Sequence, residues 1–298
     1  MSRTAIRLQV AVLAFVMVLV TAVVLLVASP GPGLLLALAI APACFLLWHF
    51  YHADEYKHES KRLLGGTFLL GALSVIPAFF IEILFERPSS DAGVLVIFFY
   101  FVFVVGLTEE LMKFISVRIY PYRSKQFDEP MDGIVFGVAA ALGFATVENI
   151  LYVFEGGIWT AVFRAIVSVP VHAFCGAILG FYLGEAKVRG RPLLALNGLL
   201  FAASLHGLFD TLSTVISSSV AALISLLAFV WVVYFKVVKK EITEAEAESP
   251  YRSRPDAPTS PKRQISTFQG AMKLCTQCGA HCQQSDKFCV SCGHRFDR

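Results

Sequence analysis

Long apolar runs follow one another through the first 240 residues of the chain, separated by short polar stretches. A helix that crosses a bilayer needs roughly 20 predominantly apolar residues. Eight runs meet that requirement, at about residues 7–28, 33–51, 63–85, 92–118, 133–154, 158–184, 192–213 and 216–236. The pattern therefore predicts an all-α polytopic membrane protein with about eight transmembrane helices.

The basic residues are concentrated in alternate loops between these runs. One set of loops holds Arg3, Arg7, Lys57, Lys61, Arg62, Arg118, Arg123, Lys125, Lys187, Arg189, Arg191, Lys236, Lys239 and Lys240. The other set holds almost none, with Arg87 as the clear exception. By the positive-inside rule both termini are expected in the cytoplasm, which agrees with an even number of helices in the cell membrane.

Two alternatives affect the helix count. The first run could be a cleaved signal peptide, but its apolar part exceeds the usual ~7 to 15 residues and Ser29–Gly33 is a poor cleavage site. The last two runs are separated only by a short uncharged turn, Ser213–Ser219, so the count could differ by one.

Composition agrees with a membrane protein, since 56% of the 298 residues are apolar, 16% are charged and the mean hydropathy is +0.68. A soluble globular protein of ordinary composition does not reach these values, so that class is excluded. The net charge of +3 is small and the basic residues lie on one side of the bilayer. Nucleic acid is therefore not an expected partner.

The sequence changes character after Lys240, where glutamate, proline and serine predict a disordered cytosolic linker over residues 241–273. Residues 274–298 then contain two Cys-x2-Cys-Gly knuckles, with Cys275, Cys278, Cys289 and Cys292. Four thiolates at this spacing predict a zinc ribbon, whose structural zinc supplies its folding energy. Because four thiolates leave zinc no open position, the ribbon is expected to dock a cytosolic protein partner rather than to catalyse.

Two alternatives apply to this tail. The cysteines could form disulfides, but the cytosol keeps thiols reduced. Cys282, His281 or His294 could replace one of the ligands, although the symmetric set of four cysteines is the simpler choice.

Ionisable side chains are concentrated in four consecutive predicted helices. Each costs at least ~2.5 to 3.5 kcal/mol at bilayer depth, so such residues are retained for function or pair with one another. Residues three or four positions apart share a helix face, and the spacing in two of the helices predicts ion pairs. We expect four of the side chains, Glu109, Glu148, His172 and His206, to meet in one cavity near the midplane. With the neutral Asn149, the whole polar set is Glu109, Glu110, Lys113, Glu148, Asn149, Arg164, His172, His206 and Asp210.

Several of these positions also have structural interpretations. His172 could be a satisfied histidine facing the bundle, Asn149 could bridge two helices, and Lys113 could snorkel inward. Gly176, one turn after His172, is expected to allow a close helix contact. The residues near the predicted outer boundary, expected to be interfacial charges, are Glu82, Glu86 and Arg164.

The motifs of the common zinc, serine and aspartyl intramembrane proteases are absent from the sequence, which has no H-E-x-x-H, no G-x-S nucleophile motif and no G-x-G-D. As a set, the polar motifs instead resemble those of the PrsW-type intramembrane proteases, which are related to the CAAX prenyl proteases and Abi proteins. The resemblance covers about residues 106–210 and implies a protease-like membrane domain over residues 1–240. The matching segments are Glu109-Glu110-x2-Lys113, Glu129-Pro130-Met131-Asp132-Gly133, Gly143 to Tyr152, Pro170-x-His172 and His206-x3-Asp210.

The resemblance implies hydrolysis of a peptide bond in a membrane-associated protein, as a step of regulated intramembrane proteolysis. It implies that Glu109 or Glu110 activates the attacking water and that His206 is the other essential side chain. The CAAX relatives have histidine where this chain has Glu148 and asparagine where it has Asp210. Carboxylates at both positions suit a metal ion better than an oxyanion, which they would repel.

Two mechanisms and two non-catalytic functions remain open at this point. With a catalytic zinc, His172, His206, Glu148 and Asp210 supply ligands and Glu109 takes the proton of the water. Without a metal, Glu109 is the base and His206 stabilises the oxyanion. The non-catalytic alternatives are a membrane scaffold with a docking tail, and a proton-coupled transporter, because Glu and His chains in membranes also form proton relays.

Overall fold

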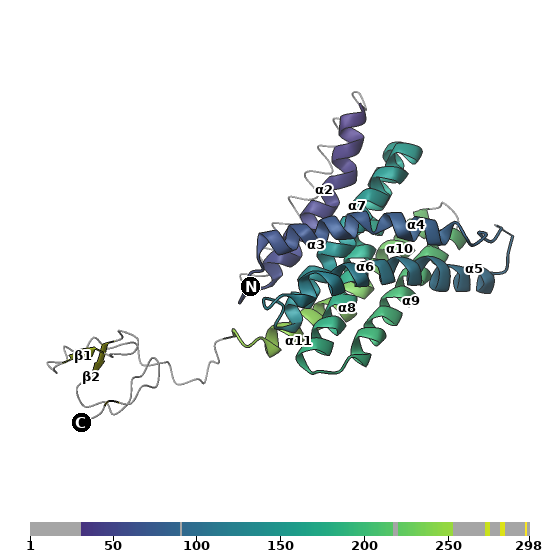
Figure 1. Ribbon diagram of the computed structural model, residues 1–298. Helices are drawn as coiled ribbons and strands as arrows, with labels where there is room; N and C mark the ends of the chain where they lie inside the picture. Colours follow the sequence, from purple (N-terminus) through teal and green to yellow (C-terminus); the bar gives the residue numbers. More distant parts are fainter. Residues whose placement is uncertain are drawn as a thin grey trace. The chain divides into compact units, whose positions relative to one another are not determined.

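The computed structural model describes residues 31–89, 91–216 and 220–252, together with 272–274, 281–283 and 296. Helices make up most of this described part (Figure 1). The α-helices are α2 (Pro32–Ala53), α3 (Lys61–Leu73), α4 (Val75–Glu82), α5 (Val94–Tyr100), α6 (Leu107–Ile119), α7 (Pro130–Phe163), α8 (Val169–Val188), α9 (Leu193–Val215), α10 (Val220–Val233) and α11 (Lys239–Glu248). Short π-helical segments, Phe101–Gly106, Arg164–Ser168 and Tyr234–Val238, join α5 to α6, α7 to α8 and α10 to α11.

Six helical stretches of the described residues are long and apolar enough to cross a membrane, which confirms the multi-pass architecture. The first predicted run, residues 7–28, lies outside the described residues. One stretch of 59 residues contains two of the predicted runs, so the count of eight stays a prediction. The stretches are Pro32–Ala53, Lys61–Glu82, Val94–Arg123, Pro130–Val188, Leu193–Val215 and Ala221–Glu248.

The 59-residue stretch is a helical hairpin. Gly157 has φ 70° and ψ −156°, a backbone conformation that glycine adopts without steric cost. On either side of it, Gly133 lies against Gly180 and Gly137 lies against Gly176, so closely that a Cβ atom on any of them would collide with the opposite limb. The chain therefore reverses at Gly157 and its two limbs run antiparallel in contact, and the close contact expected at Gly176 is confirmed.

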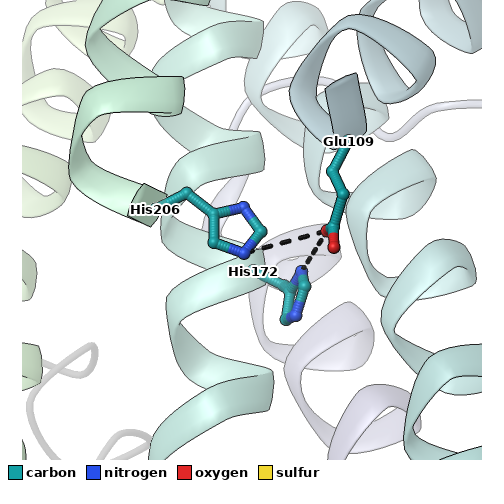
Figure 2. A group of neighbouring side chains, drawn as sticks. All are labelled: Glu109, His172 and His206. Carbon is teal, nitrogen blue, oxygen red and sulfur yellow. Dashed lines mark ion pairs between the residues drawn. The ribbon is translucent and has the colours of Figure 1, made fainter. Parts of the chain in front are cut away.

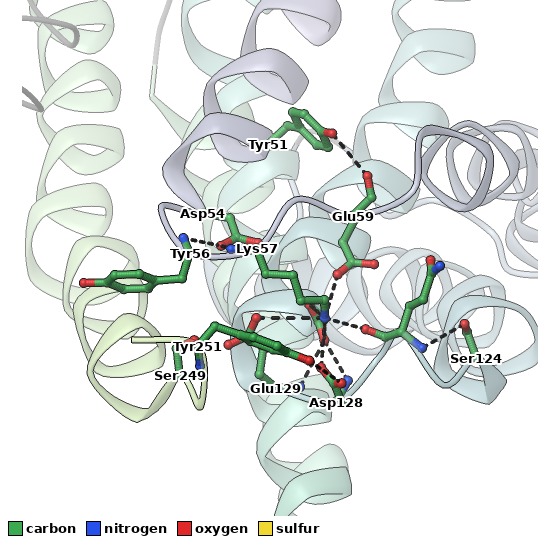
Figure 3. Close-up of polar contacts among 12 residues, drawn as sticks. Tyr51, Asp54, Tyr56, Lys57, Glu59, Ser124, Asp128, Glu129, Ser249 and Tyr251 are labelled. Carbon is green, nitrogen blue, oxygen red and sulfur yellow. Dashed lines mark hydrogen bonds and ion pairs between the residues drawn. The ribbon is translucent and has the colours of Figure 1, made fainter. Parts of the chain in front are cut away.

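Polar contacts close one end of this membrane unit, between the loop after α2 and the start of α7 (Figure 3). Lys57 Nζ reaches Asp128 Oδ1 at 2.8 Å and Asp132 Oδ1 at 2.9 Å. Two further carboxylates in this region are buried, and burial raises the pKa of Glu59 to about 8 and that of Glu129 to about 7. These contacts join loops that lie more than 70 residues apart in the sequence.

The predicted linker begins too early. Residues 239–248 form α11, in which Glu241 is 6% exposed and Ala245 is fully buried. Beyond α11 the Tyr251 hydroxyl donates to Asp128 Oδ2 at 2.8 Å. The charged composition concealed this helix because one of its faces packs on the bundle while the opposite face carries most of the charge.

The chain divides into two units, residues 1–252 and 253–298. In the second unit, strand β1 (Met272–Leu274) pairs antiparallel with β2 (His281–Gln283). The four cysteines of the predicted zinc ribbon lie outside the described residues, and the ribbon stays a prediction.

Candidate active site

A close helix contact brings α9 against the start of α6. Gly207 on α9 lies on the backbone of Val102, so that a Cβ atom there would be 2.5 Å from the Val102 Cα. Gly106 in turn lies on the backbone of Ala203, one turn before Gly207. The two glycines therefore allow His206 to reach the first turn of α6, where the paired glutamates lie.

Glu110 and Lys113 form the buried floor of the site, and neither has exposed surface. Lys113 Nζ donates to Glu110 Oε1 at 2.7 Å and to Glu109 Oε2 at 3.1 Å. Glu110 Oε1 also lies 2.8 Å from Nδ1 of His206. The pairs expected from the helix spacing are confirmed, whereas a snorkelling Lys113 is wrong because two carboxylates stabilise its ammonium group inside the bundle.

His172 on α8 is held from the other side. Its Nε2 lies 2.9 Å from Oε2 of Glu148, and Arg164 reaches the same oxygen at 2.9 Å. The Nδ1 of His172 lies 3.0 Å from Nζ of Lys113. His172 therefore contacts charged groups at both ring nitrogens.

Arg164 is not an interfacial charge, contrary to the expectation from its position in the sequence. It is 8% exposed, and its Nε donates to Asn149 Oδ1 at 2.8 Å. The turn at Gly157 returns the second limb beside the first, which brings Arg164 to Glu148. Asn149 also donates to the carbonyl of Ala39 at 2.7 Å, so its expected role in bridging helices is confirmed.

Glu109, His172 and His206 converge from three helices (Figure 2). Glu109 Oε2 is 3.8 Å from Nε2 of His206 and 3.9 Å from Nδ1 of His172. One potential ligand atom from each residue lies within 4.8 Å of the other two, and all three residues are buried. Two zinc ligands in tetrahedral geometry lie roughly 3.4 Å apart, since each bond is about 2.0 to 2.1 Å long. The arrangement is therefore close to what one small metal ion requires.

A cavity of about 710 Å³ opens beside these three residues. Asp210 is in its wall, with Oδ2 3.5 Å from Nε2 of His206. Glu82, expected to be an interfacial charge, lies in the wall as well, because α4 packs beside α6. The expectation that four of the polar residues meet in one cavity is confirmed. Its polar and aromatic lining includes Glu82, Tyr100, Glu109, Phe144, Glu148, Tyr152, Arg164, His172, His206 and Asp210.

Comparison with known proteins identifies the family. The model of the PrsW family of intramembrane metalloproteases matches residues 59–238, more than half of the chain. The chain belongs to the PrsW family. The PrsW match contains every residue of the candidate site and extends beyond the region 106–210 that the motifs indicate.

Relatives named Protease PrsW support a protease of the hydrolase class in the membrane. The relative from Bacillus subtilis (strain 168) is 35% identical over 204 residues, which are 67% of this chain and 92% of the relative. The relative from Geobacillus kaustophilus (strain HTA426) is 38% identical over 181 residues, which are 58% of this chain and 76% of the relative. No solved structure matches this PrsW chain.

Proposed function

We propose that this chain is an intramembrane endopeptidase that cleaves a membrane-associated protein, with Glu109, His172 and His206 as its reacting centre. The observation that supports this function is the convergence of the three side chains, from three helices, at the wall of one cavity. A peptide carbonyl in that cavity could contact a carboxylate and two imidazoles together, as hydrolysis requires.

The two adjacent glutamates have different roles in this proposal. Glu109 lies in the cavity wall and faces both histidines, so it is the carboxylate of the reacting centre, as a metal ligand or as the base that meets the water. Glu110 has no exposed surface, and its Oε1 is occupied by Lys113 and His206. Glu110 is therefore a positioning residue that holds Nδ1–H of His206 and leaves Nε2 towards Glu109.

The donor set fits a zinc ion, which the family description implies. One ring nitrogen of each histidine lies against a carboxylate, Glu110 for His206 and Glu148 for His172. The other nitrogen of each faces Glu109, and carboxylates behind histidines are the usual outer partners of zinc ligands. The site also places four carboxylates against two basic side chains, so a divalent cation would balance its charge.

In this metal version Glu109, His172 and His206 would hold the ion, and Glu148 orients His172 instead of acting as a ligand. Bound zinc acts as a Lewis acid and lowers the pKa of water towards about 7. With Glu109 as a ligand, Asp210 is the cavity carboxylate beside His206 that accepts the proton.

Lys113 favours a second version, without a metal. Its ammonium group lies within 3.1 Å of Glu109 Oε2 and of His172 Nδ1, so a positive charge already lies beside two of the three donors. In this version Glu109 takes the proton of the water, and His206, protonated on Nε2 as well as on Nδ1, stabilises the tetrahedral oxyanion.

The proteolytic function is tested by comparing membrane proteomes of cells that express the intact chain, Glu109→Gln or Glu86→Gln. Glu86 is exposed and lies outside the cavity wall, so its variant is the matched control. We expect single-span proteins to shorten with the intact chain and with the control, but not with Glu109→Gln. Identical profiles at equal expression would support a scaffold, and ion flux in liposomes without a protein substrate would support a transporter.

Metal analysis of the full chain separates the two versions and tests the tail. We propose that the tail thiolates bind one structural zinc. We also propose that this zinc ribbon docks a cytosolic partner and that both termini are cytoplasmic. Replacing Cys275, Cys278, Cys289 and Cys292 with serine should therefore remove one equivalent of zinc. If one equivalent of zinc remains in the four-serine variant, it supports the metal version. Less than a tenth of an equivalent in an active four-serine variant contradicts that version.

A further inference from the structure

A second polar cluster lies at the end of the membrane unit where the loop after α2 meets the start of α7 (Figure 3). We refer to it as the loop cluster. It includes two residues of the Glu129-to-Gly133 motif, to which the proposed proteolytic mechanism assigns no role. Its members are Asp54, Lys57, Glu59, Asp128, Glu129 and Asp132.

The loop cluster holds five carboxylates and a single basic side chain. Lys57 Nζ is already shared, at 2.8 Å from Asp128, 2.9 Å from Asp132 and 3.0 Å from Glu59. It also donates to the carbonyl of Gln126 at 2.7 Å. One ammonium group cannot compensate five carboxylates, of which all but Asp128 are buried, and uncompensated charge away from water is unfavourable.

One buried oxygen of Asp54 lacks a hydrogen-bond partner within the described part of the chain. Asp54 is 2% exposed, and its Oδ1 accepts the backbone N–H groups of Tyr56 and Lys57 at 3.2 and 3.0 Å. Its Oδ2 is buried without a hydrogen-bond partner among the residues that the structure describes. Asp54 also offers an oxygen within 4.8 Å of oxygens from Glu129 and Asp132, which are 1% and 0% exposed. Three carboxylates from two separate segments thus meet at one buried point.

We propose that Asp54, Glu129 and Asp132 bind one hard divalent cation of the Ca²⁺ or Mg²⁺ type. All three donors are carboxylate oxygens, which these cations prefer over the nitrogen and sulfur ligands that suit zinc. Ca²⁺–oxygen bonds are about 2.3 to 2.6 Å long, so ligand atoms up to about 5 Å apart can share one ion. Asp132 Oδ2 already accepts from Lys57 and from the backbone N–H groups of Asp128 and Glu129, whereas Oδ1 accepts from Lys57 alone, so Oδ1 is the oxygen with a lone pair left for the ion.

The cation joins two parts of the membrane unit. Asp54 directly follows α2, whereas Glu129 and Asp132 begin α7, the helix that carries Glu148. Binding there stabilises the folded state relative to the unfolded chain, by mass action. The site does not depend on the proteolytic function, because none of its three carboxylate residues lies in the cavity wall.

The test is Ca²⁺ binding to the full chain in detergent after treatment with a chelator, measured by calorimetry and by thermal unfolding. Ca²⁺ is the suitable probe because the tail thiolates and the histidine centre do not favour it. We expect one equivalent to bind with a Kd of about 10⁻³ M or tighter, the range of weak protein Ca²⁺ sites, and the unfolding temperature to rise with Ca²⁺. A parallel titration with Mg²⁺ shows which of the two ions the site prefers.

Asp54→Asn should weaken Ca²⁺ binding at least about tenfold, as expected for the loss of about 1.4 kcal/mol or more. Glu55→Gln, next to Asp54 and exposed, is the matched control and should bind as the intact chain does. Absence of saturable binding in the intact chain, or equal binding by Asp54→Asn, would overturn the site. If Asp54→Asn does not fold, the site is tested instead with Mn²⁺ bound to the intact chain, whose ligands are identified by electron spin resonance. A Mn²⁺ signal that shows no coupling to nitrogen and that Ca²⁺ displaces supports the carboxylate site. Coupling of Mn²⁺ to nitrogen would place the ion at histidine and overturn the site.

Discussion

Replacing Glu110 with alanine is expected to destabilise the membrane unit by about 3 to 5 kcal/mol. The carboxylate contacts Lys113 at 2.7 Å and His206 at 2.8 Å and has no exposed surface. Hydrogen bonds to charged groups contribute about 1.5 to 3 kcal/mol each. Removing one partner of a buried ion pair costs about 3 to 5 kcal/mol, because the other charge stays buried without compensation. The range for two such hydrogen bonds overlaps the range for a broken ion pair, so about 3 to 5 kcal/mol is the expected loss of stability.

Glu110→Gln should lose only part of this stability, about 2 kcal/mol, because an amide oxygen in the place of Oε1 can still accept both hydrogen bonds but no longer carries the negative charge. Both variants should reduce proteolysis, since His206 loses the charged carboxylate that orients it. The conservative variant should keep more activity than alanine, because Glu110 acts through His206 rather than on the substrate.

The assay is equilibrium unfolding of the full chain in mixed micelles by titration with sodium dodecyl sulfate, followed by tryptophan fluorescence. Glu86→Ala, at an exposed position, is the control and should unfold as the intact chain does. A double-mutant cycle of Glu110→Ala with His206→Ala should give a coupling energy of about 1 to 3 kcal/mol. If Glu110→Ala unfolds within 1 kcal/mol of Glu86→Ala, with no coupling to His206, the assignment of a buried ion pair is wrong.

Three further predictions concern the scaffold around the site. Arg164→Met should lower the free energy of unfolding by about 3 kcal/mol in the same titration, because its carboxylate partner loses its nearest permanent positive charge. Gly137→Val should prevent the two limbs of the hairpin from packing and abolish the folded fraction in size-exclusion chromatography, whereas Gly65→Val, with open space around its Cβ position, should fold. A chain ending after Arg252 should retain the unfolding midpoint of the membrane unit, and a large decrease would show that the tail stabilises that unit.

Local sequence patterns were sufficient for the multi-pass helical architecture and for contacts within one helix. Hydropathy predicts membrane helices because lipid requires a long apolar surface, and helix spacing pairs Glu110 with Lys113 and His206 with Asp210. Both kinds of inference use only residues that are near one another in the sequence, and the structure confirms them.

Contacts between helices required the structure. Arg164 pairs with Glu148 only because the chain reverses at Gly157, and no periodicity within either limb predicts the register of the reversal. Lys57 reaches Asp132 across 75 positions, a contact that depends on how two loops meet. The charge of residues 241–248 suggested solvation, because composition does not show which face of an amphipathic helix is buried.

The helical hairpin has a consequence for substrate selection. Its glycine contacts fix the register of the two limbs, so an extra residue within either limb would rotate everything beyond it by about 100° and misalign Glu148 or His172. Extra residues at Gly157 would leave that alignment intact. Glu155 and Thr160, on either side of this turn, line the cavity. The hairpin tip is thus the place where insertions can reshape access to the cavity while the reacting groups keep their geometry.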